Sequence, residues 1–130
     1  MRYLLDTNVV IQLWTGAAGL QRRVRQHSLA DIGVSSVASF ELVFGALKSA
    51  RAAHNLARVE ALAFESLPFD VDDARGAAEV RLALARAGMP IGPYDVLIAG
   101  QALARDLTLV THSTREFARV PGLRVEDWEA

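Results

Sequence analysis

Close to its start the chain reads Tyr3-Leu4-Leu5-Asp6-Thr7-Asn8, in which a short apolar run ends at an acidic residue. The apolar residues predict a buried strand, and the polar types that follow suit the start of a helix. Further short strands are predicted at residues 32–34, 107–111 and 124–126, with helical segments between them. Short strands that alternate with helices predict an α/β fold, with a short central parallel sheet and helices on both faces.

Proline and serine set the limits of two other predicted elements. Pro68 lies within residues 67–69 and cannot donate a backbone hydrogen bond there, so this segment is expected to be an edge strand. A helix with apolar residues at helical spacing is expected to follow Ser36 or Ser39, either of which can cap it. Glu41 lies just after the start of this helix.

Length and composition indicate a folded globular protein. The chain has 130 residues, of which 52% are apolar and 22% are charged. This length suits a single domain spanning residues 1–130. No apolar run approaches the ~20 residues that cross a bilayer, and no secretory signal pattern precedes the first strand. We therefore expect a cytoplasmic protein with no membrane partner.

Several kinds of site are excluded by residue types alone. The chain has no cysteine, which excludes disulfides, thiolate metal sites and cysteine nucleophiles. His27, His54 and His112 do not follow the spacing of a zinc-binding cluster. The net charge of -1 gives no overall basic field for nucleic acid. A local basic run at residues 22–25 is a candidate contact, although a solvated helix face is the better explanation of that run taken alone.

A second acid lies in Pro90-Ile91-Gly92-Pro93-Tyr94-Asp95-Val96-Leu97-Ile98-Ala99, where the apolar pattern predicts core. A buried carboxylate is costly unless it is paired or binds a metal ion. Because Asp6 and Asp95 both lie in such surroundings, we infer that they assemble into one acidic site. A simpler role stays open for each, since Asp6 suits a helix cap and Asp95 suits the first turn of a helix at residues 93–105.

Two more segments are candidates for the same site. Glu41 lies in a stretch that is apolar nearly all round, although a single glutamate on a helix is by default exposed. Residues 111–117 follow a predicted strand, and the active sites of parallel sheets form beyond the carboxyl ends of strands. The pattern leaves open whether the loop before its helix brings Asp95 to that end of the sheet.

Clustered carboxylates have a well-defined chemistry. Without a cation they repel one another, whereas Mg²⁺ and Mn²⁺ prefer oxygen ligands such as one or two carboxylates, water and substrate phosphate. An ion held in this way neutralises a phosphodiester and lowers the pKa of a water molecule. The acidic residues therefore favour hydrolysis of a nucleic-acid backbone.

Motifs at both ends of the chain share one order and spacing with a known family. They are residues 3–8, Glu41-Leu42-Val43-Phe44-Gly45, residues 92–99, Leu109-Val110-Thr111 through Arg115-Glu116-Phe117, and the tail segments 120–123 and 126–128. This ordered set resembles the PIN-domain ribonucleases, specifically the VapC toxins of type II toxin–antitoxin systems. No single motif is specific, and the resemblance depends on the whole set.

The resemblance implies a PIN-like fold and an endoribonuclease that depends on Mg²⁺ or Mn²⁺. It further implies tRNA or another structured RNA as substrate, a homodimer, and a VapB-type antitoxin whose C-terminal segment blocks the site.

The same resemblance assigns roles to individual residues. Asp6 and Asp95 are expected to bind the metal ion, and Glu41 to orient or activate the attacking water. Many relatives carry Asn or Asp where this chain has Ser113, and a serine hydroxyl supplies no negative charge. Glu116 is the alternative fourth acid, so Ser113 and Glu116 both remain candidates for completing the site.

Two other functions compete with the nuclease. A phosphatase of the haloacid dehalogenase type also begins with a strand that ends in Asp, but it needs a second Asp where this chain has Asn8. A catalytically weakened PIN-fold binding partner is the non-enzymatic alternative. Ser113 favours it, whereas intact Asp6, Glu41 and Asp95 argue against it.

Overall fold

The computed structural model describes residues 1–129 of the chain. Its strands are β1 (Tyr3–Leu5), β2 (Ile32–Ser35), β3 (Glu65–Leu67), β4 (Thr108–Val110) and β5 (Val125–Glu126). Its helices are α1 (Thr7–Trp14), α2 (Ala18–Arg25), α3 (Ser36–Lys48), α4 (Ala52–Glu60), α5 (Val71–Arg86), α6 (Pro93–Ala104) and α7 (Thr114–Phe117), with a 3₁₀ turn at Leu29–Asp31.

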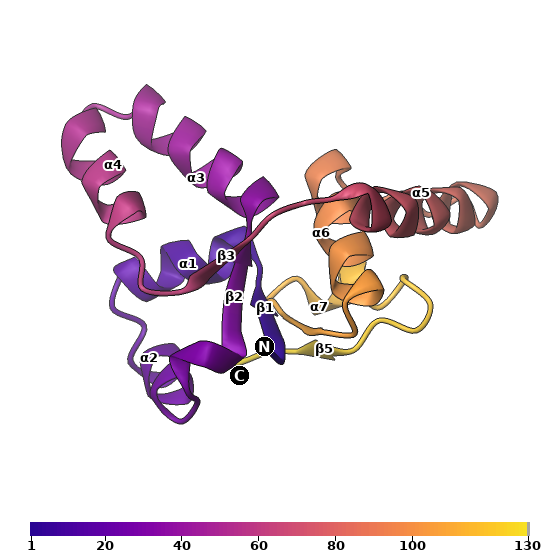
Figure 1. Cartoon of the computed structure of the whole chain (residues 1–130), viewed down its shortest axis with the longest axis horizontal. Helices are drawn as coiled ribbons and strands as arrows, with labels where there is room; N and C mark the ends of the chain where they lie inside the picture. The colour runs from indigo at the N-terminus through magenta and orange to yellow at the C-terminus, as the bar shows by residue number, and fades with distance from the viewer. Residues whose placement is uncertain (130) are drawn as a thin grey trace.

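The five strands form one parallel sheet in the order β3-β2-β1-β4-β5. From the central strand β1, the chain adds β2 and then β3 on one side of the sheet. It then crosses back and adds β4 and β5 on the other side of β1. Since crossover connections are right-handed, α1–α4 cover one face and α5–α7 cover the other, as Figure 1 shows. The expected α/β fold with helices on both faces is confirmed. The order of connections reverses between β1 and β4, which is where ligands bind in sheets of this kind.

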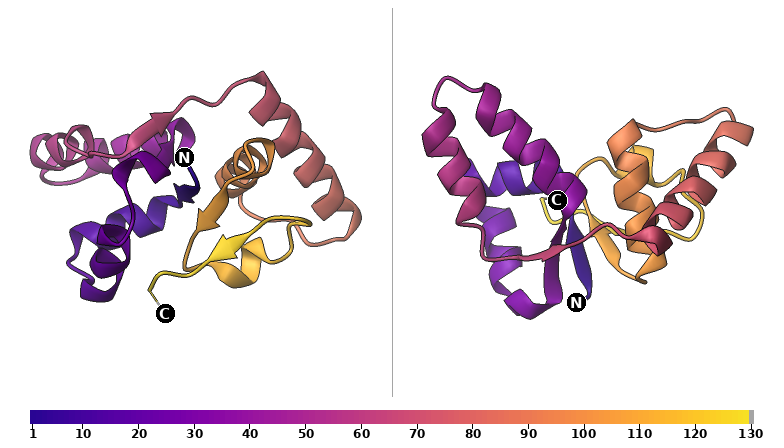
Figure 2. Two further views of the ribbon diagram at one scale, coloured as in Figure 1. Left: turned by 60° about the horizontal axis from the view of Figure 1, so that its bottom comes forward. Right: turned by 45° about the horizontal axis from the view of Figure 1, so that its top comes forward.

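The core lies between the sheet and these helices. Leu4, Leu5 and Leu109 from the two central strands are fully buried, and Ile98 of α6 and Val10 of α1 pack on them from opposite faces. Helices α3 and α4 form one hairpin, and α5 and α6 form another. The two hairpins diverge from the sheet on its two sides (Figure 2). The start of α3 and the start of α6 therefore lie above the middle of the sheet.

Three local boundaries differ from the sequence-based expectation. The edge strand covers Glu65–Leu67 rather than residues 67–69, because pairing stops before Pro68, which has no N–H to donate. Helix α3 is capped by Ser35, whose hydroxyl accepts from the Val37 N–H at 3.1 Å, and not by Ser36 or Ser39. Helix α7 was not expected from the sequence, since a helix of one turn has no apolar periodicity to detect.

Helices α5 and α6 pack unusually closely through Gly76, Ala77 and Gly100. A methyl group on Gly100 would overlap the backbone of Ala77, and one on Gly76 would lie 2.8 Å from the Gly100 carbonyl oxygen. The same helices are joined by the buried Asp73, whose carboxylate accepts hydrogen bonds from Arg105 and Gln101 at 3.0–3.1 Å. These contacts fix the position of α6, which is the helix that carries Asp95.

No helix among residues 1–129 is both long enough and apolar enough to cross a membrane.

Candidate active site

Asp6 lies at the carboxyl end of β1 and is 3% exposed. One carboxylate oxygen, Oδ1, accepts the Thr7 N–H at 2.8 Å, so Asp6 is the N-cap of α1. The other, Oδ2, accepts the Thr111 hydroxyl at 2.9 Å. Thr111 follows β4, so this hydrogen bond joins the two strands between which the sheet connections reverse. The cap role that the sequence left open for Asp6 is confirmed, and it coexists with a position at the ligand-binding edge of the sheet.

Glu41 lies in the second turn of α3, next to the start of α1. Its Oε1 accepts the Thr7 hydroxyl at 2.9 Å, while the backbone N–H of the same threonine binds Asp6. Thr7 therefore orients two carboxylates at once. The side chain of Glu41 is half-buried rather than fully exposed, as the apolar character of its segment indicated.

Asp95 lies in the first turn of α6, two residues after the Pro93 that begins this helix. Its carboxylate is half-buried and is folded back over Gly92, where an added Cβ would lie 2.9 Å from Oδ2. The ring of Tyr94 packs against Phe40 of α3 with centroids 5.4 Å apart, which joins the starts of the two helices. The loop before α6 thus does bring Asp95 to the carboxyl end of the sheet.

Glu116 and Ser113, the two candidates for the fourth member of the site, have different surroundings. Glu116, in α7, is exposed, and its charge acts on both Asp6 and Asp95. Ser113 precedes α7 and donates its backbone N–H to the Thr111 hydroxyl oxygen at 2.9 Å, but its own hydroxyl makes no capping bond to that helix. The charge near the two aspartates therefore comes from Glu116.

Burial and like charges raise the pKa values of the three central acids. For Asp6 the main cause is burial, opposed by the Thr111 and Thr7 hydrogen bonds and reinforced by the charges of Glu41 and Glu116. Burial also raises the pKa of Glu41, with a contribution from Asp95. The pKa of Asp95 is raised by burial and then by Asp6 and Glu116. Each aspartate therefore lies within electrostatic range of the other three acids, but among residues 1–129 no three of the four present oxygens within 4.8 Å of one another.

The acids of this cluster lack basic partners. The ion pairs among residues 1–129 involve neither Asp6, Glu41, Asp95 nor Glu116. Four neighbouring carboxylates with no counter-charge repel one another and lose stability on ionisation. A divalent cation that prefers oxygen ligands would relieve both effects, and the donor types suit such an ion.

Apolar hollows flank Glu41 on both sides. One groove of 580 Å³ runs between α1, α3 and α6 and is lined by Phe40, Phe44 and Tyr94 together with Glu41. A second hollow of 260 Å³ lies between α1, α3 and α4 and is lined by Trp14 and Arg58, again with Glu41. Phe40, Phe44 and Tyr94 are 53%, 57% and 43% exposed, so the acidic cluster is bordered by accessible aromatic surface.

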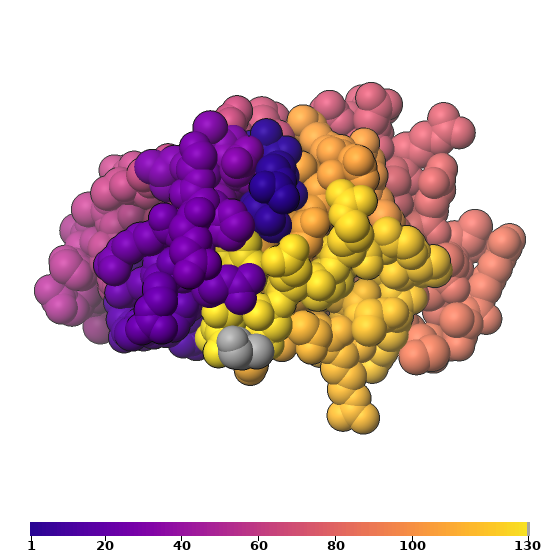
Figure 3. Space-filling model, turned by 90° about the horizontal axis from the view of Figure 1, so that it is seen from below, coloured from indigo at the N-terminus to yellow at the C-terminus, as the bar shows by residue number. Residues whose placement is uncertain are grey.

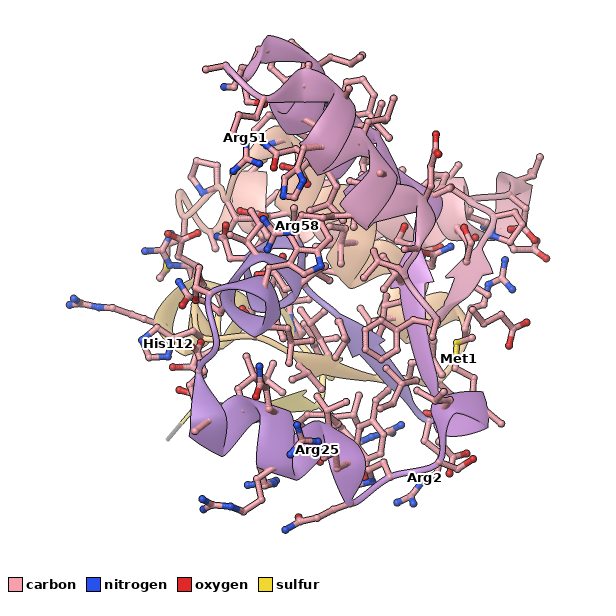
Figure 4. The ribbon with its side chains drawn as sticks, turned by 90° about the vertical axis from the view of Figure 1, so that its left-hand side faces the viewer. Met1, Arg2, Arg25, Arg51, Arg58 and His112 are labelled. Carbon is pink, nitrogen blue, oxygen red and sulfur yellow. The ribbon has the colours of Figure 1, made fainter. Side chains whose placement is uncertain are left out.

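Basic side chains lie on the face formed by α2 and α4. Figure 4 shows Arg25 of α2, Arg58 of α4 and Arg51, which directly precedes α4, on this face of the molecule. Arg58 packs over the ring of Trp14 at 4.9 Å and donates to its carbonyl oxygen at 3.3 Å. Arg23 pairs with Glu126 at 3.7 Å, so this residue of the basic run has a structural contact.

Sequence reasoning missed the residues that hold the acids in place. Thr7 and Thr111 are buried and bind carboxylates, but a threonine beside a strand has no pattern that distinguishes it from a core residue. A separate group, His112, Asp127 and Glu129, was also missed, because its members meet only once β4 and β5 are paired.

Comparisons with known proteins identify the class. The PIN domain family matches over residues 3–123, which is nearly the whole chain. The tRNA(fMet)-specific endonuclease VapC of Salmonella typhimurium is 39% identical, with 98% of each chain covered. Ribonuclease VapC2 of Rickettsia felis is 30% identical, with 99% of each covered.

Solved structures agree with these matches. The DNA-bound VapBC complex of Salmonella typhimurium contains a chain with a TM-score of 0.93 at 38% identity, with 98% of each chain covered. VapBC-1 of nontypeable Haemophilus influenzae gives a TM-score of 0.90 at 29% identity, with each chain fully covered. The chain belongs to the PIN-domain family, and within that family to the VapC ribonucleases. The resemblance seen in the sequence motifs is confirmed, and the haloacid dehalogenase alternative is overturned.

Proposed function

We propose that this chain is the toxin of a type II toxin–antitoxin pair and an Mg²⁺- or Mn²⁺-dependent endoribonuclease. The observation that supports this most directly is the group of four carboxylates from the end of β1, α3, α6 and α7, none of which has a basic partner among residues 1–129. Two relatives of the chain are named as an endonuclease and a ribonuclease, which supports the same activity here.

Asp6 and Asp95 are the proposed metal ligands. Asp6 already has one oxygen bound to Thr7 N–H and the other bound to Thr111, so its carboxylate is held in one orientation. A divalent ion at this position supplies positive charge for the scissile phosphodiester and lowers the pKa of a water molecule. The pKa values of the acids, which are raised without an ion, are lowered when the cation binds, because its charge favours their ionised forms.

Glu41 and Glu116 lie beside the proposed metal ligands. Glu41 is proposed to activate the attacking water, and Glu116 to supply the fourth negative charge of the site. Thr7 holds Glu41 by a 2.9 Å hydrogen bond and leaves its second oxygen available to accept a proton from the attacking water. Glu116 is exposed and near Asp6 and Asp95, so it suits a fourth acid that completes the site. Ser113 is proposed to contribute only through its backbone contact with Thr111.

The proposed substrate is a structured RNA, with initiator tRNA as the first candidate. A relative at 39% identity is named for cleaving tRNA(fMet). Arg58 of α4 lines the same hollow as Glu41, and Arg51 directly precedes that helix, so positive charge is available beside the acids. Guanidinium groups bind backbone phosphates and position an RNA without reading its sequence.

An antitoxin segment is the proposed inhibitor of this site. The two relatives of known structure described above were solved as VapBC complexes. The groove of Phe40, Phe44 and Tyr94 offers apolar surface to a helical or extended peptide, and Glu41 lies in its wall. A basic side chain on such a peptide would meet the unpaired acids, which explains how one segment can bind tightly and also block the metal site. Assembly as a homodimer stays a prediction.

One experiment tests the enzymatic proposal. Purified protein is incubated with total tRNA and with tRNA(fMet), in Mg²⁺, in Mn²⁺ and in EDTA, alongside D95N and the control D72N, which changes an exposed aspartate of α5. Discrete fragments that require metal, persist in D72N and disappear in D95N are the expected result. Fragments that D95N still produces would contradict the site assignment. No cleavage of any RNA by the unaltered protein would favour the weakened binding partner.

A further inference from the structure

A second set of potential metal ligands lies at the ends of β4 and β5, apart from the four acids. His112 Nδ1 is 3.0 Å from Asp127 Oδ2 and 3.5 Å from Glu129 Oε2. One donor atom from each of the three residues lies within 4.8 Å of the other two. We propose that His112, Asp127 and Glu129 form a binding site for a transition-metal ion such as Zn²⁺, which links the C-terminal segment to the end of β4.

Strand pairing brings these residues together. The Thr111 N–H donates to the Glu126 carbonyl at 3.0 Å, so the residues that follow each strand, His112 and Asp127, emerge side by side. The chain bends at Trp128, where the Glu129 N–H donates back to Asp127 Oδ1 at 2.9 Å. Through this bend both carboxylates approach His112, while Trp128 between them points into the core and is 1% exposed.

Trp128 holds the two carboxylates in position before any ion binds. Its ring stacks on His27 with centroids 4.7 Å apart and planes 8° apart, and it meets Tyr3 edge-on at 5.0 Å. Its Nε1–H donates to Glu126 at 3.0 Å. Asp127 is further fixed because its Oδ1 accepts the Glu129 N–H at 2.9 Å, which leaves Oδ2 directed at His112. A site with fixed ligands loses little conformational freedom on binding an ion.

The donor types and their spacing suit a transition metal. Two ligands bound about 2.1 Å from one ion lie roughly 3.0–3.4 Å apart for angles between a right angle and the tetrahedral value. The observed separations of 3.0 and 3.5 Å are close to this range. An imidazole nitrogen with two carboxylate oxygens favours Zn²⁺, Co²⁺ or Ni²⁺ over Mg²⁺, which the all-oxygen acidic site prefers.

The site is open to solvent and lies on the surface. The His112 side chain is 70% exposed, whereas the side chains of Asp127 and Glu129 are 20% and 19% exposed. Figure 4 shows His112 at the periphery of the molecule, and in Figure 3 the C-terminal segment, in yellow, lies on the surface beside the first third of the chain. An ion can therefore enter without unfolding, and it can complete its coordination shell with water.

The experiment separates this site from the acidic site by removing the latter. Zn²⁺ is titrated by calorimetry into the untagged chain carrying D6N and D95N, and into the same chain with H112A, D127N or H54A added. His54 is exposed and lies on α4, so H54A controls for loss of any surface imidazole. D127N removes the charge but keeps an oxygen that can accept the Glu129 N–H.

One equivalent of Zn²⁺ is expected to bind the D6N/D95N chain and the H54A chain alike. H112A and D127N should each weaken binding by more than about 100-fold, beyond the effect of losing only an outer-shell partner. The melting temperature should rise with Zn²⁺ concentration except in those two variants, while all variants melt alike in EDTA. Absence of saturable binding, or binding that H112A leaves intact, would overturn the proposal whether or not the protein cleaves RNA.

Discussion

The hydroxyl of Thr111 donates a 2.9 Å hydrogen bond to Oδ2 of Asp6, although 105 residues separate the two in sequence. The contact crosses from the end of β4 to the end of β1, and the same hydroxyl oxygen accepts the Ser113 N–H. One threonine therefore fixes both a proposed metal ligand and the segment that leads to Glu116.

Replacing Thr111 tests this positioning role. T111V keeps the size of the side chain but removes the hydrogen bond, and we expect it to lower the cleavage rate and the affinity for Mn²⁺ by about 10- to 100-fold. T111S restores the hydroxyl and should recover most of both. Cleavage rates and Mn²⁺ titrations of the two variants decide the matter. Equal behaviour of T111V and T111S would mean that the hydroxyl does not position Asp6.

Loss of a proposed ligand should eliminate activity without unfolding the protein. D6N and D95N each remove one charge and almost no volume, so the fold should persist while metal-dependent cleavage becomes undetectable. Mn²⁺ binding by calorimetry provides a readout that does not depend on knowing the RNA. Full binding and cleavage in either variant would show that the ion is held elsewhere.

The fourth acid can be identified by comparing two conservative changes. E116Q removes a charge that acts on Asp6 and Asp95, whereas S113A removes a hydroxyl that makes no hydrogen bond to the start of α7. Cleavage should therefore fall more in E116Q than in S113A. Initial rates at saturating Mg²⁺ measure the difference, and the reverse order would assign the fourth position to Ser113.

The raised pKa values of the acids predict how stability depends on pH when metal is absent. Asp95 has a higher pKa in the folded chain than in the unfolded chain, so the native state binds its proton more tightly. Stability from this group is present at low pH and is lost as pH rises through the folded pKa. In EDTA at neutral pH, D95N should therefore have a larger free energy of unfolding than the unaltered chain.

The same reasoning gives the pH range and the control for that measurement. The advantage of D95N should disappear below the ordinary aspartic acid pKa of 3.8, where the carboxyl is protonated in both states. D72N, at an exposed position of α5, should show no advantage at any pH. Urea unfolding at a series of pH values tests both points. A D95N variant that is less stable at neutral pH would contradict the unfavourable burial of this charge.

The fold and the two aspartates could be predicted from the sequence because their signals are local. The run Tyr3–Leu5 is apolar and ends in an acid, and Asp95 interrupts an apolar helix just after Pro93. The limits of short elements were less certain, as Ser35 shows, because neighbouring serines suit a cap equally well.

The contacts that complete the site depend on distant pairings and could not be predicted. Thr111 meets Asp6 only when β4 lies beside β1, and His112 meets Asp127 only when β5 lies beside β4. The strand order is decided by packing across the whole sheet, not by any one segment. The approach of Asp95 to Glu41 likewise depends on the contact between Phe40 and Tyr94.

The contact of Gly100 with Ala77 leaves no room for a methyl group between α5 and α6. Gly100 lies more than one helical turn beyond Asp95 in α6, yet its contact with α5 helps to determine where Asp95 is held. In a random mutagenesis library selected for activity, substitutions at Gly76 and Gly100 should therefore be depleted as strictly as substitutions of the acids themselves. Escape mutants that survive expression of the toxin should cluster at this helix crossing, where a change as small as glycine to alanine displaces a carboxylate it never touches.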